Sequence, residues 1–394
     1  MHPLMKDAFA LRPRLVAWRR DFHQHPELGF QEHRSARIIA QHLRALGYQV
    51  QTGVAETGVV AVAEGSGPGP TVLLRFDMDA LPIQEETGAA YASQNPGVMH
   101  ACGHDGHMAI GLGVAQLLAA RRDTWPGRVK FMFQPAEEGL GGAARMIEAG
   151  VLENPRPDYA LGLHLWNGWP VGWVGYTPGP AMAGASMFRV VLQGRGGHGA
   201  IPHTTRDPVL AAGHVITALH TIVSRNVPAQ EAGVLSVGAV HAGHAPNVIP
   251  ETATLEGTLR AFQAETLRLL EQRVRTVAQS VSQAFEVQAD VSFHDQVPPL
   301  INDPEVCARA QQAGARVWPE MNVLTDHRTM GSEDMALVLA RVPGCYFFVG
   351  SANPDRGLNA PHHHPRFDFD DEDVLPRATA LMTAAALEVL GGSP

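Results

Sequence analysis

A chain of 394 residues that is 45% hydrophobic has room for two ordinary domains, or for one large domain with an insertion, and is too apolar to be disordered. Its formal net charge of −9 argues against a nucleic-acid-binding protein, which needs a clustered basic face. The three cysteines are too few for a disulfide framework, and neither a signal-peptide core nor a run of about 18 apolar residues occurs. The sequence therefore predicts a soluble, cytoplasmic protein without a nucleic-acid or membrane partner.

The first half of the chain alternates helical and extended patterns. Residues 4–46 are predicted to be helical, with a break at His25-Pro26 and a second helix at about 31–46. Apolar runs of strand length then alternate with helical patterns, with strands predicted at 72–76, 129–133 and 159–165 and helices at 108–120 and 143–149. This alternation predicts an α/β fold in which helices flank a mostly parallel sheet.

The pattern changes after the Gly/Pro-rich residues 175–180. The elements predicted next are a strand at 187–193, a helix at 207–223, strands at 233–241 and 252–261, a helix with an apolar face from Leu267 to Val281, and a strand at 286–293. The order β-α-β-β-α-β is that of a ferredoxin-like α+β domain. The α/β pattern then resumes, with a strand at 345–349 and a helix at 371–391. We therefore expect one α/β domain formed by residues 1–183 and 299–394, interrupted by a smaller domain at 184–298.

Two motifs carry side chains that bind transition metals. Residues 100–107 (HACGHDGH) bring a thiol, an acid and three imidazoles together, and residues 134–139 (QPAEEG) place Glu137 and Glu138 after a strand. Thiolates, imidazoles and carboxylates are common ligands of zinc and related metals, and a further carboxylate can act as a base on water. Because neighbouring side chains diverge in extended backbone, we expect one glutamate to bind metal and the other to address water.

Further candidate ligands follow two later strands. His164 lies near the end of the predicted strand 159–165, and residues 362–364 (HHH) follow the strand 345–349. Since ligands bind beyond the carboxyl ends of strands in open α/β sheets, these loops are predicted to meet in one metal centre. Cys102 precedes a helix, whose dipole is expected to favour the thiolate. A thiolate can bridge two ions, so the pattern allows a dinuclear centre.

Taken one at a time, these groups also have ordinary structural explanations. A cysteine is often a core residue, and paired glutamates often begin a solvated helix. Asp77 and Asp79 could orient a ligand imidazole or could merely end a strand. Trp166, Trp169 and Trp173 could line an aromatic acyl pocket, but the core is the favoured place for them.

The motifs together resemble a known family. The resemblance is carried, in matching order, by residues 99–107, 134–139, 162–164 (GLH), 196–198 (GGH), 247–250 (NVIP) and 331–334 (GSED). They are similar to motifs of the dinuclear metallopeptidase family of aminoacylases and carboxypeptidases, within it the amidohydrolase branch of hippurate hydrolases, indole-acetyl-amino-acid hydrolases and N-acetyl-diaminopimelate deacetylases. The resemblance covers almost the whole chain. It implies a catalytic α/β domain interrupted by a smaller α+β domain that often mediates dimers.

The resemblance also implies a ligand set for two divalent ions, which could be Zn, Mn, Co or Ni. The implied ligands are Cys102 as the bridge, with His104, Glu138, His164 and His363. His363 is favoured over its two neighbours because the ligand histidine of this branch lies two residues before a proline, here Pro365. The resemblance further implies that Glu137 is the general base.

In the smaller domain, His198 matches a histidine that stabilises the oxyanion and often reaches into the site of a partner subunit. Asn247 and Arg260 match positions that hold the substrate carboxylate, a task for which the planar guanidinium of arginine is suited. The implied function is hydrolysis of the amide bond of small N-acyl amino acids by a homodimer or higher homo-oligomer. The first alternative is a dipeptidase or carboxypeptidase that uses the same centre. A binding protein without catalysis is disfavoured, because every implied ligand and the base are present.

Overall fold

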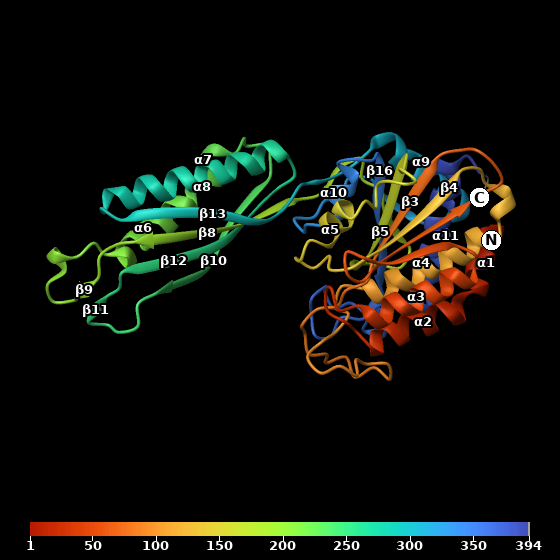
Figure 1. Ribbon diagram of the computed structural model, residues 1–394, viewed down its shortest axis with the longest axis horizontal. Helices are drawn as coiled ribbons and strands as arrows, with labels where there is room; N and C mark the ends of the chain where they lie inside the picture. The colour runs from red at the N-terminus through yellow and green to blue at the C-terminus, as the bar shows by residue number, and fades with distance from the viewer. Residues whose placement is uncertain (393–394) are drawn as a thin grey trace. The chain divides into compact units, whose positions relative to one another are not determined.

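The computed structural model describes residues 1–392 and divides into two compact units (Figure 1). The larger unit comprises Met1–Gly179, Ile301–His327 and the chain from Asp334 onward. The smaller unit comprises Pro180–Leu300 together with the short segment Arg328–Glu333, which nothing in the sequence distinguished from the rest of residues 299–394.

An eight-stranded sheet forms the centre of the larger unit. Its strands, in spatial order, are β1 (Gln49–Val54), β2 (Gly58–Glu64), β4 (Arg128–Gln134), β3 (Thr71–Asp77), β5 (Tyr159–Pro170), β16 (Gly344–Ala352), β6 (Trp173–Gly175) and β15 (Asn322–Leu324). The inner strands β4, β3, β5 and β16 are mutually parallel, whereas β1, β2 and β6 pair antiparallel with their inner neighbours. The predicted α/β class with a mostly parallel central sheet is confirmed. The hairpin of β1 and β2 was not predicted.

Helices cover this sheet on both faces. The helices of the larger unit are α1 (Pro3–Ala10), α2 (Arg12–Gln24), α3 (His33–Ala45), α4 (His104–Ala119), α5 (Gly142–Glu148), α9 (Pro304–Val317), α10 (Met335–Leu339) and α11 (Asp371–Leu390). On one face, α4 and α11 pack together against the central strands, while α5 and α10 contact strands from the other face (Figure 1). Nearly every side chain of α4 is buried, which explains why its sequence after His107 is apolar on nearly all sides.

The first predicted helix is in fact two. The helix α1 ends at Ala10, and α2 begins at Arg12 with Pro13 in its first turn. Proline lacks the N–H that an interior helical position donates, but the first turn leaves its N–H groups unpaired in any case. The proline is therefore compatible with a helix start, and it divides the helical pattern at that point.

The smaller unit has the predicted β-α-β-β-α-β order. Its main elements are β8 (Gly184–Gln193), α6 (Pro208–Leu219), α7 (Thr221–Asn226), β10 (Gly233–Ala242), β12 (Thr252–Ala261), α8 (Ala264–Ala284) and β13 (Gln288–Val297). The sheet order is β10-β12-β8-β13 with all neighbours antiparallel, and α6 and α8 pack on it around a core of its own. The ferredoxin-like prediction is confirmed. The Asp207 carboxylate caps α6 by accepting from two backbone N–H groups.

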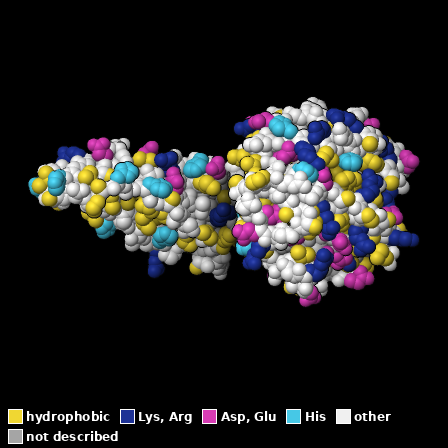
Figure 2. All heavy atoms as spheres, turned by 90° about the horizontal axis from the view of Figure 1, so that it is seen from below, with side chains coloured by type: hydrophobic (Ala, Val, Ile, Leu, Met, Phe, Trp, Pro, Cys, Tyr) yellow, Lys and Arg dark blue, Asp and Glu magenta, His cyan; other side chains and the backbone are white. Residues whose placement is uncertain are grey.

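The remaining strands are short. In the smaller unit, β9 (Gly197–His198) and β11 (Val248–Ile249) form a two-stranded ribbon. Another two-stranded pair is formed by β7 (Gly179–Met182) and β14 (Leu300–Asn302), the strands in which the chain passes from one unit to the other. Figure 2 shows hydrophobic and histidine side chains intermixed over the surface of the smaller unit. Within residues 1–392, no helix combines the length and the apolar character that crossing a membrane requires.

Candidate metal centre

The candidate ligands gather where the parallel strands of the larger unit end. The turn that contains Glu137 and Glu138 follows β4, and His164 lies in β5. His363 lies in the loop between β16 and α11, while Cys102 lies two residues before the start of α4. Because parallel strands present their carboxyl ends at one edge of a sheet, chain segments far apart in sequence meet there.

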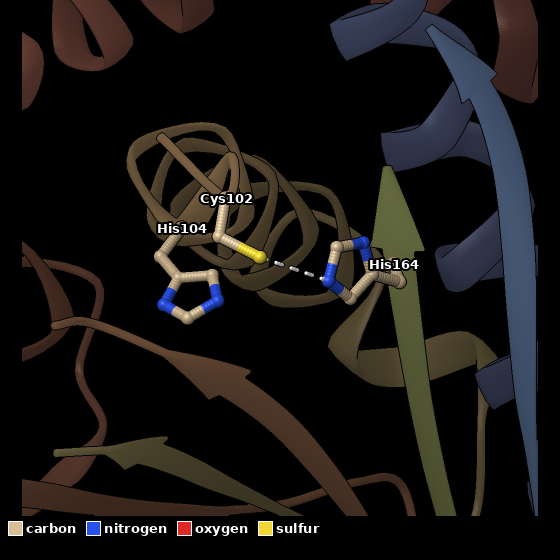
Figure 3. A group of neighbouring side chains, drawn as sticks. All are labelled: Cys102, His104 and His164. Atoms are coloured by element: carbon tan, nitrogen blue, oxygen red, sulfur yellow. Dashed lines mark hydrogen bonds between the residues drawn. The ribbon is translucent and has the colours of Figure 1, made fainter. Parts of the chain in front are cut away.

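Cys102, His104 and His164 form the centre of this group (Figure 3). All three are buried, and one ligand-type atom of each lies within 4.8 Å of the others. The Cys102 Sγ atom points toward His164 and lies 3.5 Å from its Nε2 atom (Figure 3).

Hydrogen bonds fix which ring nitrogen each imidazole presents. The Nδ1 atom of His104 lies 2.9 Å from the backbone oxygen of Asp79, and the Nδ1 atom of His164 lies 2.6 Å from the backbone oxygen of Leu165. Since carbonyl oxygens only accept, both Nδ1 atoms donate, which leaves Nε2 as the nitrogen turned toward Cys102. Among the described residues, Nε2 of buried His104 has no hydrogen-bond partner. A metal-ligating histidine typically donates one ring N–H to a carbonyl oxygen, which leaves its other ring nitrogen to bind the metal.

A second group shares Cys102 with the first. Cys102, Glu138 and His363 each place a ligand-type atom within 4.8 Å of the others, and Nε2 of His363 lies 3.2 Å from Oε1 of Glu138. The backbone N–H of Glu138 donates to Oδ2 of Asp79 at 2.9 Å. Asp79 therefore supports both groups, through its backbone oxygen in one and its carboxylate in the other.

His363 is held in an unusual backbone conformation. Its φ of 61° lies in the left-handed region, which is uncommon for a residue other than glycine, and its N–H donates to the backbone oxygen of Ala101 at 2.8 Å. Its neighbours face other partners: Nε2 of His362 donates to the backbone oxygen of Leu165, and Nδ1 of His364 accepts from the N–H of Arg366. Of the three histidines, the structure brings only His363 to Glu138.

Glu137 and Glu138 lie in a turn rather than in extended backbone, so the divergence of neighbouring side chains in an extended chain does not apply to them. Both carboxylates have an oxygen within 4.8 Å of a ring nitrogen of His104. Ala136 enters the turn with a φ of 55°, and its N–H donates to Oε1 of buried Glu32 at 2.9 Å. A left-handed residue reverses the chain direction there, which allows two adjacent side chains to face one centre.

The expected thiolate character of Cys102 is also wrong for the protein without metal. Burial raises the pKa of the Cys102 thiol, and the nearby carboxylates of Glu138 and Glu137 raise it further. Burial lowers the pKa of His104, but the carboxylates around it, with Asp77 foremost, outweigh burial and raise the pKa to about 10. Without metal, both groups therefore hold their protons at neutral pH.

The donor set fits divalent transition metals. A buried thiol, imidazoles and carboxylates are the ligands that zinc and its neighbours prefer, and a cation would balance the surplus of carboxylates. Gly103, with a φ of 89°, stands between the thiol and the first residue of α4. Only glycine adopts that conformation without strain, so Gly103 lets Cys102 and His104 approach the same point.

The other members of residues 100–107 support the ligands from behind. Nδ1 of His107 donates to Asp77 at 2.6 Å, while its Nε2 accepts from the N–H of Leu165 at 3.0 Å. Both nitrogens of His107 are thus used within the protein. Asp105 pairs with buried Arg19 and His23, with each nitrogen 2.7 Å from its Oδ2 atom.

One supporting network was missed in the sequence. Buried Arg75 donates to Asp77, Gln134 and Asp334, and Asp334 also accepts from Gln134 and from the N–H of Ala143 at the start of α5. This network joins the ends of β3 and β4, the strands that carry Asp77 and Gln134. The GSED motif signalled Asp334 but gave no indication of these partners.

The smaller unit separates its own candidate residues. His198 in β9 pairs with Val248 in β11, and the backbone oxygen of exposed Asn247 accepts from the N–H of Gly199 at 2.8 Å. This ribbon adjoins the start of β12, where the N–H of Gly194 donates to the oxygen of Glu251. Arg260 lies near the opposite end of β12, roughly 30 Å away at about 3.3 Å per residue. One copy of the smaller unit therefore does not bring Arg260 together with His198 and Asn247.

Arg260 is itself half-buried and held in place. Its Nη1 atom donates to the backbone oxygen of Met330 at 2.8 Å, and burial lowers the pKa of the guanidinium without removing its charge. Met330 belongs to the short segment Arg328–Glu333 that completes the smaller unit.

An α/β unit that gathers a thiol, imidazoles and carboxylates at its strand ends, with a ferredoxin-like insertion, has the architecture of a metallopeptidase-like hydrolase. A model of peptidase family M20/M25/M40 matches residues 73–388. The chain belongs to this family, and the resemblance predicted from the motifs is confirmed. As a member, it is a hydrolase that acts on amide bonds.

Individual relatives agree over nearly the full length. The chain is 38% identical to the N-acetyl-L-cysteine deacetylase of Bacillus subtilis over 95% of this chain and 88% of that protein. It is 36% identical to thermostable carboxypeptidase 1 of Saccharolobus solfataricus over 94% of each. The crystal structure of the Bacillus subtilis YXEP protein, described as a dinuclear metal-binding peptidase from family M20, is similar with a TM-score of 0.84 at 35% identity, covering 97% of this chain and 99% of that one.

Proposed function

We propose that this protein is a metal-dependent N-acyl-amino-acid amidohydrolase, which cleaves an N-acyl amino acid into a carboxylic acid and an amino acid. The observation that carries the proposal is the pair of overlapping ligand groups, Cys102 with His104 and His164, and Cys102 with Glu138 and His363. The similarity to a deacetylase of an N-acetyl amino acid supports the substrate class.

Each ligand group would hold one divalent ion, with Cys102 shared between them. The similarity to a dinuclear metal-binding peptidase supports two ions, and the mixed donor set admits Zn, Mn, Co or Ni. Bound ions would lower the pKa of a water molecule and polarise the amide carbonyl.

Glu137 is the proposed general base. Its carboxylate lies beside the ligand groups, with an oxygen within 4.8 Å of a ring nitrogen of His104. It would accept a proton from the attacking water as the new C–O bond forms, and then deliver that proton to the amide nitrogen as the C–N bond breaks. The acid product keeps the water oxygen, and the released amine gains the proton.

The smaller unit is proposed to bind the rest of the substrate. Arg260 and Asn247 would hold the amino-acid carboxylate, and the imidazole of His198 would donate to the developing oxyanion. Because Arg260 and His198 lie at opposite ends of β12, we propose that the two come from different copies of the chain in a homodimer or higher homo-oligomer. Exposed apolar side chains support an interface on this unit, since Met187, Val240 and Val248 are 41%, 49% and 54% exposed.

A substrate panel tests the proposal. Metal-loaded protein should release amino acid from N-acetyl, N-benzoyl and indole-acetyl amino acids, and a chelator should abolish the release. The alternative is a carboxypeptidase or dipeptidase, which the similarity to a carboxypeptidase favours. Turnover of short peptides combined with inertness toward every N-acyl amino acid would select that alternative. The three free cysteines are compatible with the cytoplasm, where we propose the protein acts.

A further inference from the structure

An aromatic cluster adjoins the candidate metal centre in the larger unit. Trp166 follows His164 by two residues on β5, so both side chains leave the same face of the strand. The two ring centroids are 5.9 Å apart, with the rings nearly perpendicular. Trp166 therefore lies beside the ring of a candidate metal ligand.

The cluster extends from Trp166 over two further half-buried rings. Trp166 lies 5.5 Å from the ring of His327, and His327 lies 4.2 Å from the ring of Trp169. We call Trp166, Trp169 and His327 the aromatic wall. Behind it, buried Phe348 on β16 contacts all three rings.

The position of Trp166 is well defined by its surroundings. Its ring is tilted by 32° against the ring of His362 at 4.9 Å, next to the candidate ligand His363. A Cβ atom placed on Gly168 would lie 2.7 Å from Nε1 of Trp166, so the glycine permits the indole to lie close to the backbone. A ring fixed in this way offers a preformed surface, which loses little conformational entropy when it binds another ring.

One polar atom of the wall is left without a partner. Among the described residues, Nε2 of His327 is buried and makes no hydrogen bond. A side chain that served only as core would be expected to pair such an atom, since leaving a buried polar group unpaired is unfavourable. The wall thus combines apolar ring surface with one unpaired polar atom, as ligand sites commonly do.

Trp173 differs from the other two tryptophans. It is also half-buried, but it lies in β6, and within the described residues it makes no ring contact with the wall. The sequence placed all three tryptophans in one group after His164, whereas the structure separates Trp173 from the pair beside the metal centre.

We propose that the aromatic wall binds the acyl group of the substrate and selects flat aromatic acyl groups, such as benzoyl and indole-acetyl. The inference rests on the proposed amidohydrolase function. The carbonyl that reacts at the metal centre is part of the acyl group, so an aromatic ring one or two bonds from that carbonyl can reach Trp166. The opposite end of the substrate is its carboxylate, which is assigned to Asn247 and Arg260.

The test compares three substrates that share one chemistry: N-acetylglycine, N-benzoylglycine and N-acetylphenylalanine. The wild-type protein should give a higher kcat/KM on benzoylglycine than on acetylglycine. In Trp166→Leu and Trp169→Leu, the ratio of these two values should fall about tenfold, the upper end of what one aromatic contact contributes. Trp173→Leu is the matched control and should keep the wild-type ratio.

The outcomes separate this inference from the proposed function. An unchanged benzoyl-to-acetyl ratio in both variants, or a loss confined to acetylphenylalanine, would overturn the acyl assignment while leaving the amidohydrolase intact. Wild-type protein that is inert on all three substrates would instead refute the function. Because Trp166 touches His164, the metal content of each variant is measured, and Trp166→Phe should recover most of the ratio if stacking is the cause.

Discussion

Replacing Asp105 with asparagine should destabilise the protein without removing its metal. The Asp105 carboxylate accepts from Arg19 and from His23 at 2.7 Å each, and all three side chains are fully buried. Removing one partner of a buried ion pair costs about 3–5 kcal/mol. Arg19 keeps its contacts with Asp368 at 2.7 Å and Asp371 at 3.4 Å, so we expect a loss near the lower end, about 3 kcal/mol.

The pH of the measurement follows from the direction of the pKa shift. Burial raises the pKa of Asp105, but the ion pairs with Arg19 and His23 outweigh burial and hold the pKa well below its usual range. A depressed carboxyl pKa contributes stability that is complete above the unfolded value, about 3.9, and is lost as the pH falls below it. Neutral pH therefore shows the full effect, and the difference between D105N and wild type should shrink in acid.

Urea unfolding of the metal-free proteins at pH 7, followed by tryptophan fluorescence, measures the loss. The matched control is Glu64→Gln, which breaks the exposed pair of Glu64 with Arg128 and should cost less than about 1 kcal/mol. A D105N loss no larger than that of the control would refute the account of the buried network. Loss of bound metal from a D105N protein of normal stability would show that Asp105 is a ligand.

Three further predictions concern the ligands, their backbone and the partner subunit. Metal binding should release a proton from each of Cys102 and His104, because the pKa values of both groups are raised, and metal affinity should therefore rise with pH. Calorimetry in buffers of different ionisation enthalpy counts the released protons. Binding without proton release would contradict the assigned protonation. Gly103→Ala should lower the free energy of unfolding by about 1–2 kcal/mol and weaken metal binding, since alanine at a φ of 89° is strained. Thermal unfolding and metal titration measure the two effects. A variant with unchanged stability and metal affinity would show that the backbone can relax. Mixing inactive His198→Ala and Glu137→Gln proteins should restore about a quarter of wild-type activity. About half of the randomly formed dimers contain one chain of each kind, and one of the two sites in such a dimer is complete. No recovery after subunit exchange would place His198 in the site of its own chain.

Much of the candidate centre could be predicted because each ligand motif follows a strand that is apolar enough to recognise. Buried parallel strands such as β3, β4 and β5 give continuous apolar runs, and the geometry of such sheets brings their carboxyl ends together. Cys102, Glu138 and His164 could therefore be grouped from the sequence. The family motifs then narrowed the histidine cluster to His363, the member that lies beside Glu138.

The supporting contacts could not be predicted in the same way. Arg19 and Asp105 are 86 residues apart, and nothing local in the sequence shows which distant charges will pair when both are buried. The left-handed backbone of Ala136 and His363 was equally hidden, because tertiary contacts impose it on residues that do not favour it. The pKa of Cys102 was misjudged for the same reason: burial and nearby carboxylates, which depend on the fold, outweigh the helix dipole.

The most direct test of the central claim is the Glu137→Gln variant, analysed for both bound metal and hydrolysis of an N-acyl amino acid. The glutamine keeps the shape of the side chain but cannot take a proton from water, and removing a general base lowers kcat by about 10²–10⁴-fold. The proposed roles predict that activity is lost to this extent while both metal ions remain bound. Loss of a metal ion would show that Glu137 is a ligand, and near-normal activity would show that another group takes the proton.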